Sequence, residues 1–586
     1  MPVLGAQFLL EPCGARAFFV PEDFSRDELE LAATARRFME REVLPKIPAM
    51  ENKDFAETRR LLQRAGELGL LMTAVPEEYG GLGLPNRVSG LISESVSLYG
   101  GFSVSHGAHT KIGTQPLVYF GTEEQKSKWL PRLASGELIA AYALSEPGSG
   151  SDAQAAKTLA KLSADGKHYV VTGAKQWITN GAIADLFTVF CQIDDGSGKL
   201  EFSALMVELG TPGFEVGREE HKLGIRGSST TPLTFQEALI PVENRLGAVG
   251  DGAKIAFNIL NVGRYNLAIG TIGGVKEGLK LAMEYATERK QFGVPLMRFG
   301  ALRQKAAEIA VTIFGMEAMG YRVAGLVDTL AEETAQSGKA LTGADKMKPI
   351  EEYAIEASIA KVWCSDMLNV AASECLQMYG GYGYVEDYPA ERMFRDARIN
   401  MIFEGTNEVN RLLIPGMLLK RAMKGRLGVM QWLGRLGDGP AAPPEGPLSA
   451  ERDAADRLKG LAGVVLQAAA LKHMQALEKE QQVLLMLADL IIDAYLCDSA
   501  VGRALQRRAK GLPTDVSDAM ARVTASHTTD RAHANARRCA RALASGPALD
   551  ALLSRLDAWS PALRSDVVAD RDLIADALAA RGAYPL

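Results

Sequence analysis

The chain has 586 residues, of which 47% are hydrophobic and 23% charged, and its formal net charge is -6. This length allows about four domains with sizeable cores, and the slightly acidic balance does not suggest general nucleic-acid binding. Six cysteines are scattered without a CxxC pair, which argues against a disulfide framework and fits a reducing compartment. No basic segment followed by an unbroken apolar stretch opens the chain, so we expect a cytoplasmic, bacterial-type protein without a signal peptide.

Hydrophobic spacing divides the first part of the chain into regions of different character. After a tail over residues 1–26, residues 27–138 carry apolar residues at helical spacing. Residues 139–248 instead contain short β-type runs, namely 169–173, 186–191 and 232–235. Helical periodicity returns over 249–424. Elements segregated in this way argue against an alternating βαβ sheet.

Two further segments complete the chain. Residues 425–448 end in a stretch rich in Gly, Pro and Ala and are predicted to be a linker. Residues 449–586 are rich in Ala and Leu and are predicted to form an extra helical domain, in which 482–492 is apolar nearly all round and therefore buried. The predicted fold class is multidomain and mainly α, with a central β domain, a helical bundle and a C-terminal helical extension.

The segment from 409 to 437 contains no acidic residue, and its cations interleave with leucines and Trp432. One interpretation is a core helix followed by a solvated linker. The alternative is a membrane-interfacial segment, in which the cations would meet anionic headgroups while Trp432 and the leucines enter the acyl boundary. This second hypothesis would make the protein peripherally membrane-associated.

Glu404 is the candidate catalytic residue. It lies in the run 402–408, shortly after the glycine-rich run 379–384. An acid followed by Gly and flanked by apolar residues can face an apolar cleft while its backbone N–H stays accessible. Burial raises the pKa of such a carboxyl towards the working pH and suits it to abstract a proton next to a carbonyl, and the N–H can hold the developing oxyanion. An acid before Gly is more often a loop or cap residue, so other motifs must decide.

Three other motifs have competing interpretations. Residues 148–153 match G-x-G-x-x-A, but no βαβ unit surrounds them, so the pattern favours a turn over a dinucleotide site. Arg289 and Gln291 close a predicted helix, either as an ordinary C-terminus or as a diphosphate clasp. Trp177 and Thr179 are two apart on a strand, so both lie on one face, where an indole could pack on a flat heterocycle.

His106 and His109 are three residues apart, but no third ligand lies within sequence reach. A role in the core or in a pocket is therefore favoured over a metal site, and we predict no bound metal.

Together these segments resemble the acyl-CoA dehydrogenase family. Residues 141–152 resemble its first signature, and 377–384, 395–398 and 403–406 resemble its second. The ordered match runs from about residue 27 to 424. The extra C-terminal domain, with small residues at Gly107 and Ala108, resembles the very-long-chain branch of the family.

The resemblance implies FAD-dependent α,β-dehydrogenation of a medium- or long-chain fatty acyl-CoA to a trans-2-enoyl-CoA, a step of β-oxidation. Glu404 would be the general base, the β hydride would pass to flavin N5, and the Glu404 N–H with a flavin hydroxyl would hold the thioester oxygen. Contacts with FAD, some of them from a neighbouring subunit, would come from Tyr142, Leu144, Ser145, Trp177, Thr179, Arg289, Gln291, Phe299, Gln377, Gly380, Gly381, Thr406 and Glu408. Contacts with the substrate would come from Ser151, Asn261, Arg264, Phe403 and Gly405.

The resemblance also implies partners and leaves two alternatives. The electron acceptor would be an electron-transferring flavoprotein, and the C-terminal domain would cover the surface through which shorter relatives form tetramers, leaving a homodimer. Gly107 and Ala108 leave room at the floor of the acyl tunnel, so we expect chains of roughly C12 or longer. An acyl-CoA oxidase would use the same base with oxygen as acceptor. A scaffold or assembly protein on this fold would be expected to have lost the base or the flavin contacts.

Overall fold

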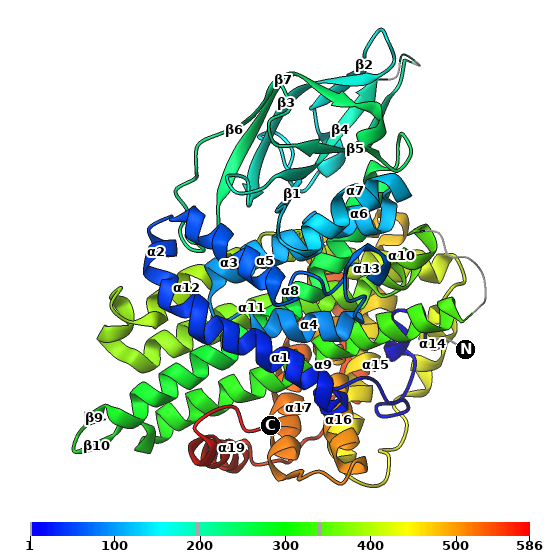
Figure 1. The fold of residues 1–586 in the computed structure, drawn as a ribbon. Helices are drawn as coiled ribbons and strands as arrows, with labels where there is room; N and C mark the ends of the chain where they lie inside the picture. The colour runs from blue at the N-terminus through cyan, green and yellow to red at the C-terminus, as the bar shows by residue number, and fades with distance from the viewer. Residues whose placement is uncertain (1–2, 195, 197, 337–342) are drawn as a thin grey trace.

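The computed structural model describes residues 3–194, 196, 198–336 and 343–586. Helices from the N-terminal, bundle and C-terminal regions pack into one body, and the strands of the middle region stand on one side of it (Figure 1). The predicted fold class, mainly α with a central β domain, is confirmed.

The N-terminal region is helical. Ser25 caps the first helix by accepting a hydrogen bond from the Glu28 N–H, while the Glu28 carboxylate accepts one from the Ser25 N–H, and Thr122 and Gln125 repeat this box at the last helix. A π-helix, Ala108–Gly113, continues directly from α5. The helices are α1 Arg26–Phe38, α2 Ile47–Glu51, α3 Phe55–Glu67, α4 Asn86–Ser95, α5 Gly100–Gly107, α6 Gln115–Phe120 and α7 Glu123–Ala134.

The middle region forms one mixed sheet in the order β6-β7-β3-β2-β4-β5-β8, with β1 pairing parallel to β4. The strands are β1 Ala140–Ala143, β2 Leu159–Leu162, β3 His168–Thr179, β4 Leu186–Asp194, β5 Leu200–Glu208, β6 Phe214–Val216, β7 Thr230–Pro241 and β8 Arg245–Leu246. The three β-type runs predicted from the sequence lie in β3, β4 and β7. A register shift between Lys175 and Ile178 marks a bulge in β3, and Trp177 has a φ of 63° there.

Four long helices form the bundle, with α11 packed on α8, α9 and α13. The elements of this region are α8 Gly252–Glu288, the hairpin β9 Lys290–Gln291 and β10 Val294–Pro295, α9 Gly300–Ala335, α10 Gly343–Glu352, α11 Ala354–Tyr379, α12 Pro389–Ala397 and α13 Asn407–Met423. By length and hydropathy α9 could cross a membrane, but 83% of its most apolar window is buried inside the protein. The helix is therefore explained by its place in the core.

The C-terminal region consists of α15 Ser449–His473, α16 Gln481–Ala509, α17 Asp515–Leu543, α18 Gly546–Ala558 and α19 Val567–Arg581. Helix α16 packs against α9 and α13 of the bundle, and α19 also packs against α9. One continuous apolar core includes side chains of the bundle and of these helices. The predicted buried run 482–492 lies at the start of α16, where most of its apolar side chains are buried.

The structure corrects the prediction for residues 425–448. The segment contains a helix, α14 Val429–Arg435, and Trp432, Leu433 and Leu436 are buried in the main core. The indole of Trp432 lies against Gly463 of α15, where a Cβ would come within 2.8 Å of it. The apolar side chains that a membrane-interfacial segment would need are thus used inside the protein, and that hypothesis is wrong for Trp432 and these leucines.

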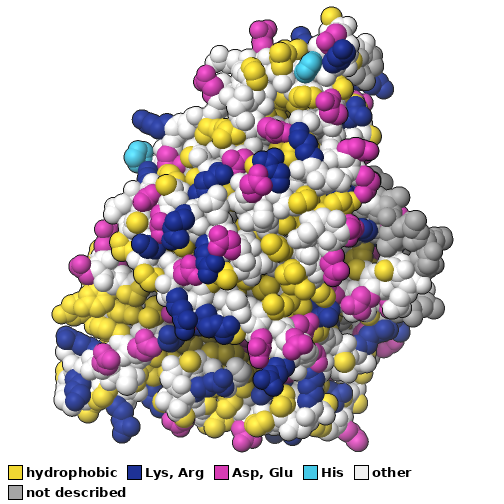
Figure 2. Space-filling model, in the orientation of Figure 1, with side chains coloured by type: hydrophobic (Ala, Val, Ile, Leu, Met, Phe, Trp, Pro, Cys, Tyr) yellow, Lys and Arg dark blue, Asp and Glu magenta, His cyan; other side chains and the backbone are white. Residues whose placement is uncertain are grey.

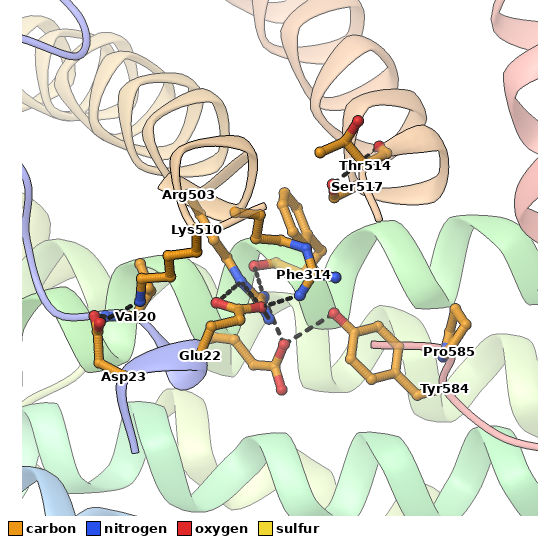
Figure 3. Close-up of polar contacts among 12 residues, drawn as sticks. Val20, Glu22, Asp23, Phe314, Arg503, Lys510, Thr514, Ser517, Tyr584 and Pro585 are labelled. Carbon is orange, nitrogen blue, oxygen red and sulfur yellow. Dashed lines mark hydrogen bonds and ion pairs between the residues drawn. The ribbon is translucent and has the colours of Figure 1, made fainter. Parts of the chain in front are cut away.

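A buried ion network ties both ends of the chain to the bundle. Arg503 of α16 lies between Glu22 of the N-terminal tail, at 2.7 Å, and Glu317 of α9, at 2.6 Å (Figure 3). The hydroxyl of Tyr584, near the C-terminus, donates to the same Glu317 carboxylate at 2.9 Å. Lys276 of α8 approaches the other Glu317 oxygen at 2.5 Å. Arg503, Lys276 and Tyr584 share the Glu317 carboxylate, and Arg503 also binds Glu22, so the tail, bundle and C-terminal helices are held in one arrangement.

Figure 2 shows an apolar patch at the end of the molecule where the β9–β10 hairpin and α12 lie in Figure 1. Exposed apolar side chains of these elements and of the turn between α11 and α12 are Phe292, Tyr382, Tyr384, Val385 and Phe394. A patch of this kind is typical of an interface with another molecule.

We expect Arg503→Met to lower the free energy of unfolding by about 3 kcal/mol, because removing one partner leaves buried carboxylates without compensation. Arg26→Met is the control, since the Arg26–Glu30 pair is exposed and such pairs contribute about 1 kcal/mol or less. Urea unfolding followed by circular dichroism would measure both. Equal effects of the two substitutions would contradict a stabilising role for the network.

Candidate active site

A deep cleft lies between α4, α5 and the π-helix on one side and α8, α11 and α12 on the other. Its volume is about 1450 Å³ including the open mouth, and its wall is mainly apolar. Helix α8 turns four glycines towards it, namely Gly263, Gly270, Gly274 and Gly278. Because these positions lack side chains, the cleft runs along α8 instead of being filled by it.

Glu404 lies in this cleft, in the loop before α13. Glu404 has a φ of 58° and Gly405 a φ of 79°, so two successive residues adopt the left-handed conformation. A non-glycine residue there is held against its backbone preference by its surroundings. The turn places the Glu404 carboxyl against Gly263, where an added Cβ would lie 2.3 Å from Oε2. Gly263 therefore makes room for the carboxyl.

Three side chains fix the backbone of this loop. Lys361 of α11 donates from Nζ to the Gly405 carbonyl at 2.8 Å, and Asn410 donates from Nδ2 to the same oxygen at 2.8 Å. The Arg264 Nε–H donates to the Glu404 carbonyl at 3.3 Å. Lys361 also donates to the side-chain oxygen of Asn407 at 2.7 Å. With both carbonyls held, the carboxyl and the N–H of Glu404 have defined directions.

Burial controls the electrostatics of the site. Desolvation raises the pKa of Glu404 to about 7, although Arg264 and Lys361 oppose this shift. Desolvation likewise lowers the pKa of Lys361 to about 7. Glu404 Oε2 is buried and has no hydrogen-bond partner within the described chain. An uncommitted carboxyl that titrates near neutrality in an apolar cleft can serve as a general base.

Two of the predicted cofactor or substrate residues line the cleft together with Glu404, namely Thr179 and Phe403. Trp177, two residues before Thr179, exposes 61% of its surface, an unusual exposure for an indole. The bulge in β3 turns it out of the sheet, whereas Ile178 is buried. The edge of the β domain thus offers an aromatic face beside the cleft that could pack on a flat cofactor.

A second group of predicted residues lies at the end of the bundle, and none of its members lines the cleft. The guanidinium of Arg289 stacks over Tyr382, and Phe292 packs edge-on against Phe299. Gly380 and Gly381 have open space where a side chain would lie. This group consists of Arg289, Gln291, Phe299, Gln377, Gly380 and Gly381. A single copy of the chain therefore presents the two groups as separate surfaces.

The remaining predicted residues have structural partners of their own. Tyr142 and Leu144 are buried, and burial followed by the Glu404 charge raises the pKa of Tyr142 well above its usual value. Arg264 is buried and donates to Asn261 at 2.6 Å, so these two act within the site as positioning groups. Thr406 caps α13, while Ser145 is partly buried and Ser151 and Glu408 are exposed.

The structure also shows the conformation of residues 148–153 and the surroundings of His106 and His109. Residues 148–153 form a turn after an isolated bridge between Glu146 and Ser149, as the sequence favoured. His106 and His109 are buried, and each bonds a backbone carbonyl through Nε2, of Leu70 and Leu133 respectively. Both imidazoles therefore have partners within the protein, and His106 also lines the cleft.

Lys361 and Gly263 are functional residues that sequence reasoning missed. Lys361 lies in the run Ile355–Trp363 of α11, where it is fully buried among apolar neighbours. A single cation in this largely apolar run of the sequence could have indicated a buried, functional lysine. Gly263 lies before Arg264 on a helix where glycine disfavours helix formation; this is a signal for close approach of another group.

Comparison with known proteins agrees with this geometry. Family models described as the acyl-CoA dehydrogenase N-terminal, middle and C-terminal domains match residues 25–137, 141–238 and 250–419. A further model, described as an acyl-CoA dehydrogenase C-terminal domain, matches residues 457–557.

Individual relatives cover most of the chain. A probable acyl-CoA dehydrogenase of Bacillus subtilis is 46% identical over 85% of this chain and 84% of its own length. The mouse very long-chain specific acyl-CoA dehydrogenase is 35% identical over 77% of this chain and 71% of its own. The crystal structure of an acyl-CoA dehydrogenase from Bacillus anthracis complexed with FAD is 41% identical, with a TM-score of 0.95 and complete coverage of both chains. The chain therefore belongs to the acyl-CoA dehydrogenase family of enzymes.

Proposed function

We propose that this enzyme catalyses FAD-dependent α,β-dehydrogenation of a long-chain fatty acyl-CoA, with Glu404 as the general base. The observation that carries the proposal is the free Glu404 Oε2, buried in the glycine-lined cleft beside Gly263. Proton abstraction next to a thioester carbonyl needs a base of this kind, close to neutral in pKa and shielded from water.

The chain's own residues account for the proton-transfer half of the reaction. Glu404 would accept the α proton, and the cations Arg264 and Lys361 keep a sufficient fraction of it ionised near pH 7. In the described chain, the Glu404 N–H donates to no protein acceptor, so it is free to hold the thioester oxygen as negative charge develops there. FAD, when bound, supplies the acceptor for the hydride that leaves the β carbon.

The residues present fit FAD. Thr179 lines the cleft, and the exposed indole of Trp177 lies two residues before it in the chain, so a flavin ring would pack on the indole and find a hydrogen-bond partner in the Thr179 hydroxyl. Arg289 and Gln291 are exposed and would hold the diphosphate end of an FAD bound to a neighbouring subunit.

The shape of the cleft supports a long acyl chain as substrate. Gly107 and Ala108 line it, and a Cβ on Gly107 would meet nothing within 4 Å. Together with the glycines of α8 they extend the cleft beyond the position of Glu404. Each methylene group buried there would contribute about 0.8 kcal/mol to binding.

The acceptor and the assembly follow from the same proposal. Reduced FAD would pass its electrons to an electron-transferring flavoprotein, in the cytoplasm, and the exposed patch around Tyr382 and Phe292 would pair two copies of the chain. An oxidase would instead pass electrons to oxygen. Hydrogen peroxide formed in air, compared with reduction of an artificial dye, distinguishes the two reactions.

Replacing Glu404 with Gln should keep binding of FAD and acyl-CoA but lower turnover by at least about a thousandfold, because the amide keeps shape and loses basicity. Glu215→Gln is the control, since Glu215 is exposed on β6 and does not line the cleft. Flavin bleaching by palmitoyl-CoA in a stopped-flow instrument measures the step directly. Bleaching at a near-normal rate in Glu404→Gln would reject the assignment.

The pH dependence of bleaching should report Glu404. Because the ionised form is the base, the rate should rise with pH through the pKa of about 7. Lys361→Met removes a cation that lowers this pKa, so the rise should move to higher pH. Lys361→Arg keeps the charge and should restore the profile in part. An unchanged profile in Lys361→Met would contradict the electrostatic role of this residue.

A scan of acyl-CoA chain lengths should give the highest kcat/KM at roughly C12 or longer. Gly107→Leu places a side chain into the open part of the cleft and should lower kcat/KM for palmitoyl-CoA by at least about tenfold while affecting butyryl-CoA less. Gly416→Leu is a matched control, because Gly416 is a helical glycine with open space around it on the exposed side of α13. Butyryl-CoA as the best substrate of the unmodified enzyme would disprove the long-chain preference.

A further inference from the structure

Lys111 is a buried cation in the wall of the cleft. It belongs to the π-helix Ala108–Gly113, exposes 5% of its surface and lines the cleft. π-helical turns are rare and frequently mark functional sites. The open space beside Gly107 lies four residues earlier in the chain, about one helical turn away, so Lys111 borders a part of the cleft that has room for a ligand.

No described residue supplies a counter-ion to Lys111. Its Nζ donates to the Ser89 hydroxyl and approaches the Ser89 carbonyl at 3.5 Å, and the Ser89 hydroxyl in turn bonds that of Thr73. These partners are neutral, and an ammonium has three N–H donors. Within the described residues Lys111 forms no ion pair. Burial alone lowers its pKa to about 7.

Other buried lysines show what is missing at Lys111. Lys175 pairs with Glu146 at 2.7 Å, and Lys459 pairs with Asp498 at 2.7 Å. Lys361 is the other buried lysine in the described chain, and the charge of Glu404 raises its pKa against desolvation. Lys111 alone among these four has no carboxylate acting on it. Since burying a charge costs free energy unless the charge is paired, the missing carboxylate partner of Lys111 needs an explanation.

The wall beside Lys111 is polar as well. The Tyr265 hydroxyl bonds Asn86 at 2.6 Å, and Ile269 packs on Gly90, so the turn 265–269 of α8 lies beside the turn of α4 that carries Ser89. On that turn of α8, Asn266 lines the cleft, and its Oδ1 has no hydrogen-bond partner. Methylene groups alone would leave these polar groups unsatisfied.

We infer that the cleft accepts acyl-CoA substrates whose chain ends in a carboxylate, and that Lys111 is the counter-ion for that carboxylate. The inference rests on the proposed function, since it names a substrate class for the same cleft. The thioester end would lie at Glu404, and the distal carboxylate would receive the free N–H of Lys111. The Asn266 Nδ2 already donates to the Val262 carbonyl at 3.0 Å, so the donor assigned to the carboxylate is Lys111. The base and its chemistry are unchanged; what Lys111 adds is recognition of the far end of the chain.

The test compares mono-CoA esters of unbranched dicarboxylic acids with plain acyl-CoAs of the same length, over a series from about six to sixteen carbons. The comparison is made near pH 6.5, where Lys111 is mostly protonated; its titratable neighbour His106 is neutral there, because burial lowers the pKa of His106 to about 3. Both substrate series depend equally on Glu404, so the ratio of their kcat/KM values isolates the distal group. At one or more lengths the dicarboxylic ester should match or exceed the plain ester.

Lys111→Met keeps the length of the side chain and removes the charge. It should lower kcat/KM for the preferred dicarboxylic ester by at least about tenfold relative to kcat/KM for the plain ester of the same length. Lys420→Met, at an exposed lysine of α13, is the control and should change neither. A thermal shift of the holoenzyme with each ester gives a second readout that does not need turnover, and Lys111→Met should reduce the shift for the dicarboxylic ester alone.

Several results would overturn the inference. The first such result is that the enzyme prefers the plain ester at every length and that Lys111→Met leaves the ratio of the two kcat/KM values unchanged. Another is an ω-hydroxyacyl-CoA that depends on Lys111 while the carboxylates do not, which would assign the site to a hydroxyl bonded by Lys111 and Asn266. Failure of the enzyme to oxidise any plain ester would contradict the proposed function itself, and the carboxylate site would fall with it. Normal oxidation of plain esters with no dependence on Lys111 would contradict only the carboxylate site.

Discussion

The site depends on one constraint, the placement of the Glu404 carboxyl in an apolar cleft by a left-handed turn. The turn is possible because Gly405 follows Glu404 and because Gly263 leaves space opposite. Lys361 and Arg264 stabilise this conformation by donating hydrogen bonds to the two carbonyls of the turn. The same two cations oppose the rise in the pKa of Glu404 that burial causes. Backbone geometry and proton affinity are therefore set by the same side chains.

The bundle that carries this turn is held by contacts from distant parts of the sequence. Helix α8 presents its glycines to the cleft on one face, and on another Lys276 joins Glu94 of α4 and Glu317 of α9. Glu317 is also bound by Arg503 and Tyr584 from the C-terminal region. The extra domain thus contacts α9, which Glu317 joins to α8 of the cleft wall, and its apolar core is continuous with that of the bundle. Packing of the extra domain against the bundle and the position of α8 in the cleft wall are thus linked through Glu317.

Sequence reasoning reached the order of elements, the fold class and the family, because these depend on local periodicity and on runs of residues such as 141–152 and 402–408. It failed at residues 425–436, where a basic, apolar run was compatible with a membrane surface. Cations of the basic run that precede this segment bind acids far away in the chain: Arg421 binds Glu352, and Arg411 binds Asp489. A local window cannot show such partners, nor that Trp432 would find its place against Gly463. Lys361 was missed for the same reason, since its importance arises from a loop more than 40 residues later in the chain.

Buried lysines in this chain fall into two kinds, and the distinction carries functional meaning. Lys175 and Lys459 have carboxylates supplied by the protein, and their role ends with the stability of the fold. Lys361 and Lys111 border the cleft, and burial lowers the pKa of each to about 7. For Lys361 the partial compensation comes from the charge of the Glu404 carboxyl. A cation beside a ligand cavity that lacks a full counter-charge interacts strongly with any charge that the ligand or the reaction brings near it. The interaction is strong because the surroundings have a low dielectric constant and few other charges offset the cation. The wall of the cleft is thus mainly apolar yet polarised at two points, near Glu404 by Lys361 and elsewhere in the wall by Lys111.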